Sequence, residues 1–121
     1  MSAFDAVAKL KRLGLFKGVT GRSVKGERIT LAVVDLDPNS VVPEHHHENE
    51  QLGFVIKGTL IFRIGTETRN CVAGDTYVIP SNVPHQVTTG PEGATVCDAF
   101  APTRADWEKL EKLPASPPRW P

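Results

Sequence analysis

Short apolar or alternating runs, separated by turn residues, follow one another through residues 19–101 of the chain. Alternating apolar and polar positions are typical of strands with one buried face, and clusters of Gly, Pro, Asn and Asp mark turns between them. Turns at intervals of about eight to twelve residues predict an all-β sandwich or barrel, not alternating strands and helices. The predicted strands are residues 29–36, 41–47, 52–57, 59–64, 67–72, 76–80, 84–88 and 94–101.

Helical spacing is found before the strands. Apolar side chains recur three and four residues apart through residues 3–13, Ser2 is placed to cap this segment, and Gly14 is placed to end it. The pattern predicts an N-terminal helix over 3–13.

A second short helix is predicted after the strands, at residues 105–113, with Thr103 as its cap and Trp107 on its apolar face. The remaining residues, 114–121, are rich in proline, which forbids a helix and favours an extended path along the surface. Trp120 is the expected anchor of this tail.

Length and charge narrow the class of protein. At 121 residues the chain suits one hydrophobic core, which predicts a single domain over 1–121 with its barrel at about 19–101. Fourteen basic and fourteen acidic residues balance, so bulk charge favours neither nucleic acid nor an anionic membrane as a partner. No secretory signal or membrane span is readable, so we expect a cytoplasmic protein in which Cys71 and Cys97 are reduced, packed thiols.

All four histidines fall in two short segments, PEHHHENEQ and PSNVPHQ. Residues two apart on a strand project from the same face, so His45 and His47 point one way, and Gln51 keeps the same parity. His85 would join them from another strand if the sheet curves into a barrel. Imidazole is the commonest metal ligand in proteins, so these four side chains predict a metal site. The alternative is an exposed histidine patch without a metal.

The spacing of these residues resembles two motifs of the cupin family. The stretch from His45 through Gln51 to Gly58 is similar to the first motif, and the stretch from Gly74 to His85 is similar to the second. The resemblance implies a double-stranded β-helix, or jelly-roll barrel, that binds one divalent metal ion through His45, His47, Gln51 and His85.

The chain departs from the family pattern at three informative positions. Asn39 and Asn82 stand where the family has glycine, and asparagine is the next-best residue for a left-handed turn. Gln51 stands where the family's glutamate ligand is usual. Glu50 is the reserve candidate, because a turn after His47 could change the parity of the strand.

Three imidazoles and an amide oxygen are all neutral, so a bound ion would keep its full double charge. Such a site binds metal less tightly than one with a carboxylate, but it attracts an anionic substrate more strongly and polarises carbonyl or hydroxyl groups better. This favours proton transfer over oxygen activation. Zn, Ni, Mn, Fe or Co would fit these donors.

A second constellation lies near the end of the last strand, at Asp98, Phe100 and Arg104. Aspartate is depleted in strands and rarely buried without a partner. One interpretation is a structural ion pair between Asp98 and Arg104. The other is a pocket wall, in which Asp98 is a catalytic acid/base, Phe100 packs on a sugar ring and Arg104 binds a carboxylate.

The stretches VVPEHHHENEQLGFVIKG, GDTYVIPSNVPH and DAFAPTRADW resemble, more narrowly, the pectin-degradation cupins of the KdgF type. These enzymes open 4,5-unsaturated uronates to linear 4-deoxy-5-keto uronates with a three-histidine, one-glutamine metal site. The resemblance implies a small anionic substrate, catalytic roles for Asp98, Phe100 and Arg104, and a homodimer with contacts from the N-terminal helix and the Trp120 tail. An iron-dependent dioxygenase and a non-catalytic metal- or sugar-binding module are the alternative functions.

Overall fold

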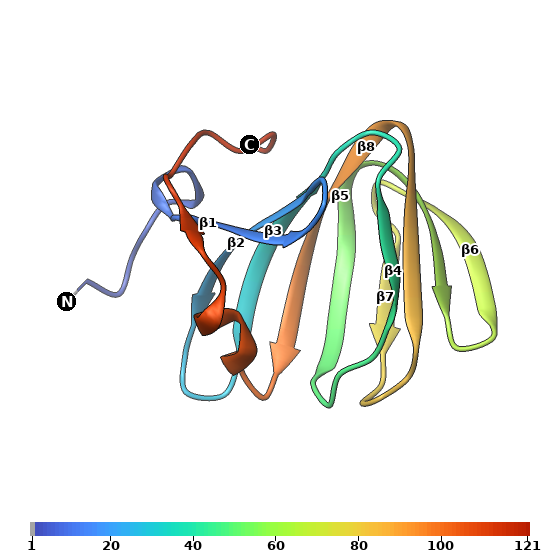
Figure 1. Ribbon diagram of the computed structural model, residues 1–121, viewed down its shortest axis with the longest axis horizontal. Coiled ribbons are helices and arrows are strands. Elements are labelled where there is room, and N and C mark those ends of the chain that lie inside the picture. The colour runs from blue at the N-terminus through green and yellow to red at the C-terminus, as the bar shows by residue number, and fades with distance from the viewer. Residues whose placement is uncertain (1) are drawn as a thin grey trace.

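The computed structural model describes residues 2–121 and is built almost entirely of strands (Figure 1). The strands are β1 (Arg12–Phe16), β2 (Val19–Lys25), β3 (Thr30–Leu36), β4 (Val41–His45), β5 (Glu50–Ile64), β6 (Glu67–Val72), β7 (Thr76–Ile79), β8 (His85–Ala101) and β9 (Lys112–Leu113). Two 3₁₀ turns, η1 (Val7–Lys9) and η2 (Ala105–Lys109), are the helical elements of the described residues.

The two longest strands, β5 and β8, each run through both layers of the fold and join them. The first half of β5 pairs with β7 and its second half with β6, while β8 pairs with β4 at its start and with β3 at its end. One layer is therefore β7-β5-β8-β3-β2-β1-β9, and the other is β4-β8-β5-β6. The predicted strands 52–57 and 59–64 are one bent strand, β5. The predicted strands 84–88 and 94–101 are likewise one bent strand, β8.

The sheet is not closed into a ring, which corrects the prediction of a closed barrel. Its hydrogen-bonded order runs from β6 to β9. Two strands lie outside this order: β4 pairs only with β8, and β7 pairs only with β5. The layers are instead held together by the bends of β5 and β8 and by the side chains packed between them.

The N-terminal helix predicted at 3–13 is wrong. Only η1 forms a helical turn, and the Ser2 hydroxyl accepts a local hydrogen bond from the Phe4 amide at 3.1 Å. Leu13 belongs to β1, where it pairs with β2 and is buried. Pairing and burial hold Arg12 and Leu13 in β1, whereas residues 3–11 have no buried side chain, so no core contact stabilises a helix there.

The C-terminal helix predicted at 105–113 is also wrong in extent. Only the single turn η2 forms. The Thr103 carbonyl accepts a hydrogen bond from the Ala105 amide, and no side chain caps the turn. Trp107 is buried as its apolar position predicted. The following residues form β9, which pairs with Arg12 and Leu13 of β1.

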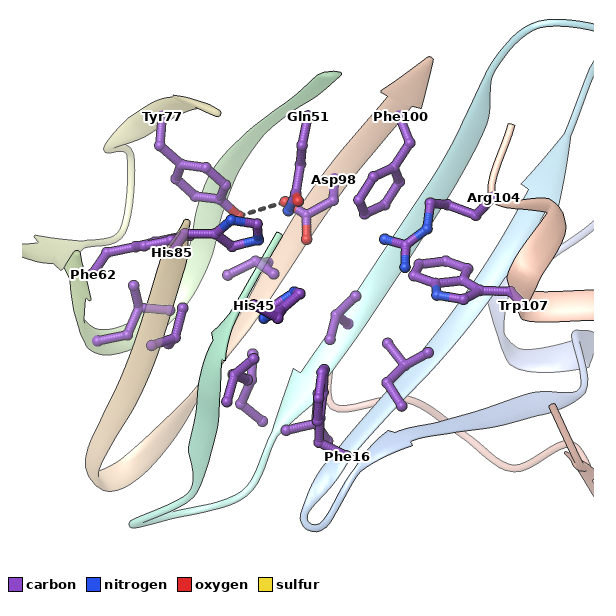
Figure 2. A pocket seen from close by; sticks show the side chains of 18 of the residues that line it. Phe16, His45, Gln51, Phe62, Tyr77, His85, Asp98, Phe100, Arg104 and Trp107 are labelled. Carbon is purple, nitrogen blue, oxygen red and sulfur yellow. Dashed lines mark hydrogen bonds between the residues drawn. The ribbon is translucent and has the colours of Figure 1, made fainter. Parts of the chain in front are cut away.

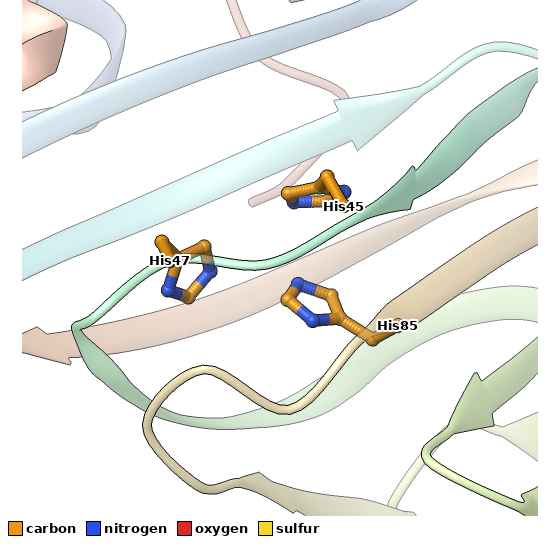
Figure 3. Close-up of side chains that lie close together, drawn as sticks. All are labelled: His45, His47 and His85. Carbon is orange, nitrogen blue, oxygen red and sulfur yellow. The ribbon is translucent and has the colours of Figure 1, made fainter.

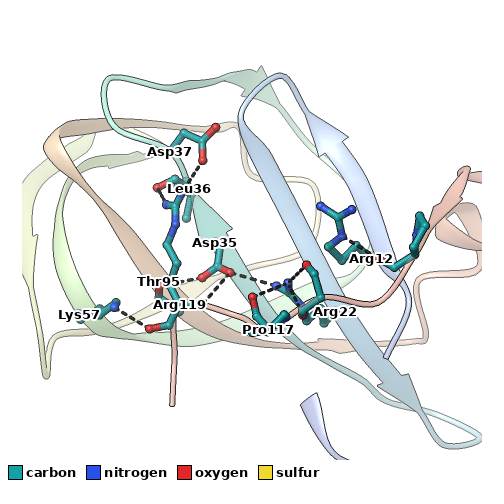
Figure 4. A network of polar contacts seen from close by, with 11 residues as sticks. Arg12, Arg22, Asp35, Leu36, Asp37, Lys57, Thr95, Pro117 and Arg119 are labelled. Atoms are coloured by element: carbon teal, nitrogen blue, oxygen red, sulfur yellow. Dashed lines mark hydrogen bonds and ion pairs between the residues drawn. The ribbon is translucent and has the colours of Figure 1, made fainter. Parts of the chain in front are cut away.

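The tail at 114–121 follows an extended path over the outer side of β2 and β3 (Figure 4). Buried Arg22 donates to Asp35 at 3.0 Å and to the Ser116 carbonyl at 3.0 Å, and Lys57 donates to the Arg119 carbonyl at 2.6 Å. Trp120 remains 41% exposed, so these polar contacts, not the predicted indole, anchor the tail.

Two smaller predictions agree with the structure. Asn39 and Asn82 have positive φ angles of 55° and 61°, as left-handed turns require. Cys71 and Cys97 are free thiols. No helix among residues 2–121 has the length and apolar character needed to cross a membrane.

Candidate metal and substrate site

A cavity of about 220 Å³ lies between the two layers. We define its polar end by His45, Gln51, His85 and Asp98. At this end the start of β5 pairs with the end of β8, and the start of β8 pairs with the end of β5. Its apolar end lies toward the bends of those strands and is lined by Val34, Leu36, Val42, Leu60, Val87 and Val96. The volume suits a small molecule and not a polymer.

Three imidazoles meet at the polar end (Figure 3). His45 ends β4, His47 follows it in the loop before β5, and His85 begins β8. One ring nitrogen from each lies within 4.8 Å of those of the other two. His46 is exposed, as its opposite parity predicted. The structure therefore brings together the three histidines that the sequence predicted would meet.

Backbone carbonyls fix the orientation of all three rings. The Nδ1 atoms of His45, His47 and His85 each lie 2.9 Å from a carbonyl oxygen, those of Pro43, Asn49 and Val83 respectively. A carbonyl can only accept, so each Nδ1 carries the proton and each Nε2 presents its lone pair. This is the arrangement by which proteins prepare histidines for a metal ion.

Gln51 supplies a fourth oxygen beside this cluster. Its Oε1 lies 3.2 Å from Nε2 of His47, and its amide group also donates a hydrogen bond to Asp98. Two acceptor atoms therefore face each other, an arrangement that a cation between them would stabilise. Glu50, the reserve candidate, is exposed on the other side of the strand. The donor set thus fits a divalent metal ion.

Burial keeps the imidazoles of His47 and His85 neutral. It lowers the pKa of His85 to about 4, with a smaller contribution from the neighbouring histidines. The pKa of His47 is also lowered, first by burial and then by the positive charge of Arg104. Both rings are therefore in the metal-binding form at neutral pH.

Asp98 is buried and bonded to Tyr77, a side chain that the sequence pattern did not single out. The Tyr77 hydroxyl donates to its Oδ1 at 2.5 Å, and the two side chains lie beside Gln51 in Figure 2. Burial raises the pKa of Asp98 to about 6, although the hydrogen bonds from Tyr77 and Gln51 oppose the rise. Burial and the adjacent Asp98 raise the pKa of Tyr77 well above its ordinary value, so the phenol remains a donor.

Gly53 makes the contact between Tyr77 and Asp98 possible. A Cβ at this position would collide with Oδ1 of Asp98 and would lie 2.6 Å from the Tyr77 ring. A glycine inside a strand pattern often marks such a close approach. Gly53 is therefore the signal in the sequence from which this group could have been found.

Arg104 lies at the same end of the cavity but does not pair with Asp98 (Figure 2). Its guanidinium carbon is 4.8 Å from the centre of the Phe100 ring and 4.5 Å from that of Trp107. It donates to Asp106 from Nε at 3.1 Å and from Nη2 at 2.9 Å. The structural ion pair considered for Asp98 is therefore replaced by one with Asp106.

Comparison with known proteins identifies the architecture. The model of the Cupin domain family matches residues 32–100. The solved structure of KdgF from a Halomonas species aligns with a TM-score of 0.79 at 24% identity, covering 88% of this chain and 98% of the other. At that identity the likeness shows the fold alone.

Two curated relatives match shorter stretches. The pectin degradation protein KdgF of Dickeya dadantii (strain 3937) is 34% identical over 65 residues, which is 54% of this chain and 59% of the relative. An H2HPP isomerase of Bacillus subtilis is 37% identical over 65 residues, which is 52% of this chain and 27% of the relative. The matches thus span less than two thirds of either relative.

Proposed function

The chain belongs to the cupin family, and from that premise we propose that it is a metal-dependent isomerase that opens the ring of 4,5-unsaturated uronates. The relative from Dickeya dadantii, a pectin degradation protein, supports this class of substrate. The single observation that carries the proposal is the polar end of the cavity, where an acid/base carboxyl and a guanidinium lie beside the three-histidine cluster.

We assign His45, His47, His85 and Gln51 as the residues that would hold the metal ion. The ion, one of Zn, Ni, Mn, Fe or Co, would supply Lewis-acid polarisation of substrate oxygens. Because all four donors are neutral, they leave its positive charge available to an anionic substrate.

Phe100 and Arg104 would orient the substrate. Phe100 is buried in the cavity wall and offers an apolar surface to a sugar ring. Arg104 is held between two aromatic rings, which fixes the plane of its guanidinium. A substrate carboxylate would bind this group in exchange for Asp106 or beside it, since a guanidinium can donate to more than one carboxylate.

Asp98 would move the protons of the reaction. When the bond between C1 and the ring oxygen breaks, the C1 hydroxyl loses a proton to become an aldehyde and the ring oxygen gains one to become an enol. The enol then loses its proton as C4 gains one, which leaves a ketone at C5 with no net change in composition. A carboxyl whose pKa is about 6 can both accept and donate protons near neutral pH.

The experiment uses the protein without a histidine tag, loaded in turn with each of the five metals. We expect unsaturated galacturonate to lose the absorbance of its enol-ether double bond faster than it does spontaneously. Asp98→Asn protein that still binds metal is the matched control and should be slow. A rate equal to the spontaneous one with every metal would refute the proposal.

The same measurements separate the alternatives. The match to the H2HPP isomerase of Bacillus subtilis supports isomerisation of a different substrate, which turnover of H2HPP would reveal. Oxygen uptake with Fe(II) would indicate a dioxygenase. Tight uronate binding without turnover would indicate a non-catalytic sugar-binding module.

A further inference from the structure

Strand β1 contains a bulge where it borders the cavity. Gly14 pairs with Thr20 and Phe16 pairs with Val19, so β1 has one more residue, Leu15, than β2 in this stretch. A one-residue shift in register turns the following side chains to the other face of a sheet. Bulges are common beside active sites, where they re-aim a side chain. The side chain that this bulge re-aims is Phe16.

Without the bulge, Phe16 would point out of the molecule. Leu13 is buried in the core, and regular alternation from Leu13 would turn Leu15 inward and Phe16 outward. Phe16 instead shares a face with Val19, because directly paired residues of neighbouring strands project to the same side. Leu15, Phe16 and Val19 all line the cavity. The bulge therefore adds an aromatic ring to the cavity wall.

The end of β1 that carries Phe16 is held by a tight turn. Lys17 and Gly18 form the two-residue turn between β1 and β2, and Gly18 has a φ angle of 75°, in the region that favours glycine. The Gly18 carbonyl accepts a hydrogen bond from the Asp37 amide at 2.8 Å, which joins the turn to the segment after β3. The ring is therefore presented by an anchored hairpin and not by a free loop.

Phe16 and Phe100 flank the histidine cluster. The ring centres of Phe16 and His45 are 5.3 Å apart, and those of Phe100 and His47 are 5.9 Å apart. The ring centres of His45 and His47 are themselves 5.7 Å apart. In Figure 2, Phe16 and Phe100 lie on either side of His45, and both line the cavity. A molecule bound at the cluster would therefore meet one phenylalanine ring on each side.

We infer that Phe16 is a second aromatic contact of the substrate, across the cavity from Phe100, and that it selects for cyclic acids. The inference rests on the proposed function, which supplies the cyclic uronate. The faces of a sugar ring carry C–H groups, and an aromatic ring offers them a flat apolar surface. An acyclic acid of the same charge would still reach Arg104 and the metal site, but it would gain little from Phe16.

The exposure of Phe16 suits this role. Phe16 is 38% exposed, so a ligand can still cover part of its ring, whereas Phe100 is 3% exposed and packs against Trp107. Phe16 also lies outside the cluster of buried core residues, so its replacement removes a cavity contact without leaving a void in the core. Variants at Phe16 should therefore fold and report on ligand binding.

Binding of galacturonate, a cyclic uronate without the double bond that the reaction needs, gives the test. In untagged protein loaded with Zn(II), calorimetric titration should show that Phe16→Ala weakens galacturonate binding by about 3- to 10-fold. Phe16→Tyr keeps the ring and should stay within about two-fold of the native affinity. The affinity for lactate, an acyclic acid, should be unchanged in both variants. Phe4→Ala is the matched control and should bind as the native protein does, because Phe4 is 89% exposed and is not part of the cavity lining.

The outcomes separate this inference from a structural role and from the proposed function. If Phe16→Ala lost galacturonate and lactate affinity equally, or lost Zn(II) affinity, the ring would only position His45, and the inference would be overturned. Unchanged galacturonate affinity in Phe16→Ala, or a native protein that binds no galacturonate, would also overturn it. A selective loss of galacturonate binding, in a protein that does not open unsaturated galacturonate, would support the inference and refute the proposed function alone.

Discussion

The two ends of the cavity are built by the same strands but contribute differently to the molecule. β8 supplies His85 and Asp98 to the polar end and Val87 and Val96 to the apolar end. Burial of the aliphatic side chains lowers the free energy of the folded state. Burial of a polar group raises it unless a hydrogen-bond partner satisfies the group. The apolar end of the cavity therefore stabilises the fold. The polar end lowers that stability, because it keeps histidine and aspartate side chains buried.

Partners within the protein reduce the cost of the polar end without removing it. The histidines donate to backbone carbonyls, and Asp98 receives hydrogen bonds from Tyr77 and Gln51. These contacts leave the three Nε2 atoms and a carboxyl with a raised pKa facing one another. Substitutions at the polar end should therefore weaken metal binding more than they change stability. Substitutions at the apolar end should lower stability more than they change metal binding.

The largest effect is expected at the polar end, from His47→Ala. Loss of a direct donor should weaken metal binding by more than about 100-fold, because even groups that only orient a ligand contribute about 10- to 100-fold. The free energy of unfolding of the metal-free protein should change little. Calorimetric titration with metal and denaturant unfolding measure the two quantities, and His46→Ala is the control because His46 is exposed.

Leu60→Ala at the apolar end should reverse this signature. Leu60 is 2% exposed, so the substitution leaves a void and should lower the free energy of unfolding by about 3 kcal/mol. Metal affinity measured below the unfolding transition should stay within a few-fold of the native value. A large loss of affinity with little loss of stability would show that the two ends are not separable.

Asp98→Asn should stabilise the metal-free protein at neutral pH. The carboxyl has a folded pKa of about 6 against an ordinary value of 3.8, so the native state binds more protons and loses stability as pH rises from about 4 to 6. Asparagine removes a penalty of up to about 3 kcal/mol. It also loses one accepted hydrogen bond, worth about 1 kcal/mol, so we expect a net gain of about 2 kcal/mol.

Denaturant unfolding at several pH values checks this prediction. The difference between the Asp98→Asn variant and the native protein should shrink toward zero or reverse below about pH 4, where both side chains are uncharged. Protonation of the histidines affects both proteins and cancels in the difference. A gain that does not vary with pH would show that the carboxyl is not ionising in a buried site.

The regular alternation of the sequence predicts most strands, but it does not show where a strand bends. Gly58 has the character of a turn residue between two strands, yet the chain continues through it in β5 with shifts in pairing on both sides. A glycine permits either a turn or a bulge, and the choice depends on a partner strand that is distant in sequence. The end of the predicted N-terminal helix shows the same limit, because Arg12 and Leu13 join β1, which pairs with β2 and β9.

Parity along the chain predicted that His45, His47 and Gln51 would lie on one side. They do meet, but across a loop and not along one strand, because β4 ends at His45 and β5 begins at Glu50. Tyr77 could not be found in this way, because its bond to Asp98 joins strands β7 and β8 across the intervening β5. Alternation assigns Tyr77 to the inward face but does not identify the carboxyl that it meets there. The local sign was Gly53, the residue between them.

Tyr77→Phe should have the smallest effect, and it tests whether the hydroxyl tunes the carboxyl or only fills space. Its hydrogen bond lowers the pKa of Asp98, so removing it should raise that pKa above about 6. The ionised native state should then lose about 1 kcal/mol at neutral pH and less at about pH 4, where the carboxyl is protonated. A void alone would destabilise the protein equally at both pH values. Because phenylalanine keeps the ring that packs against Phe62, a pH-dependent loss would isolate the hydroxyl as its cause.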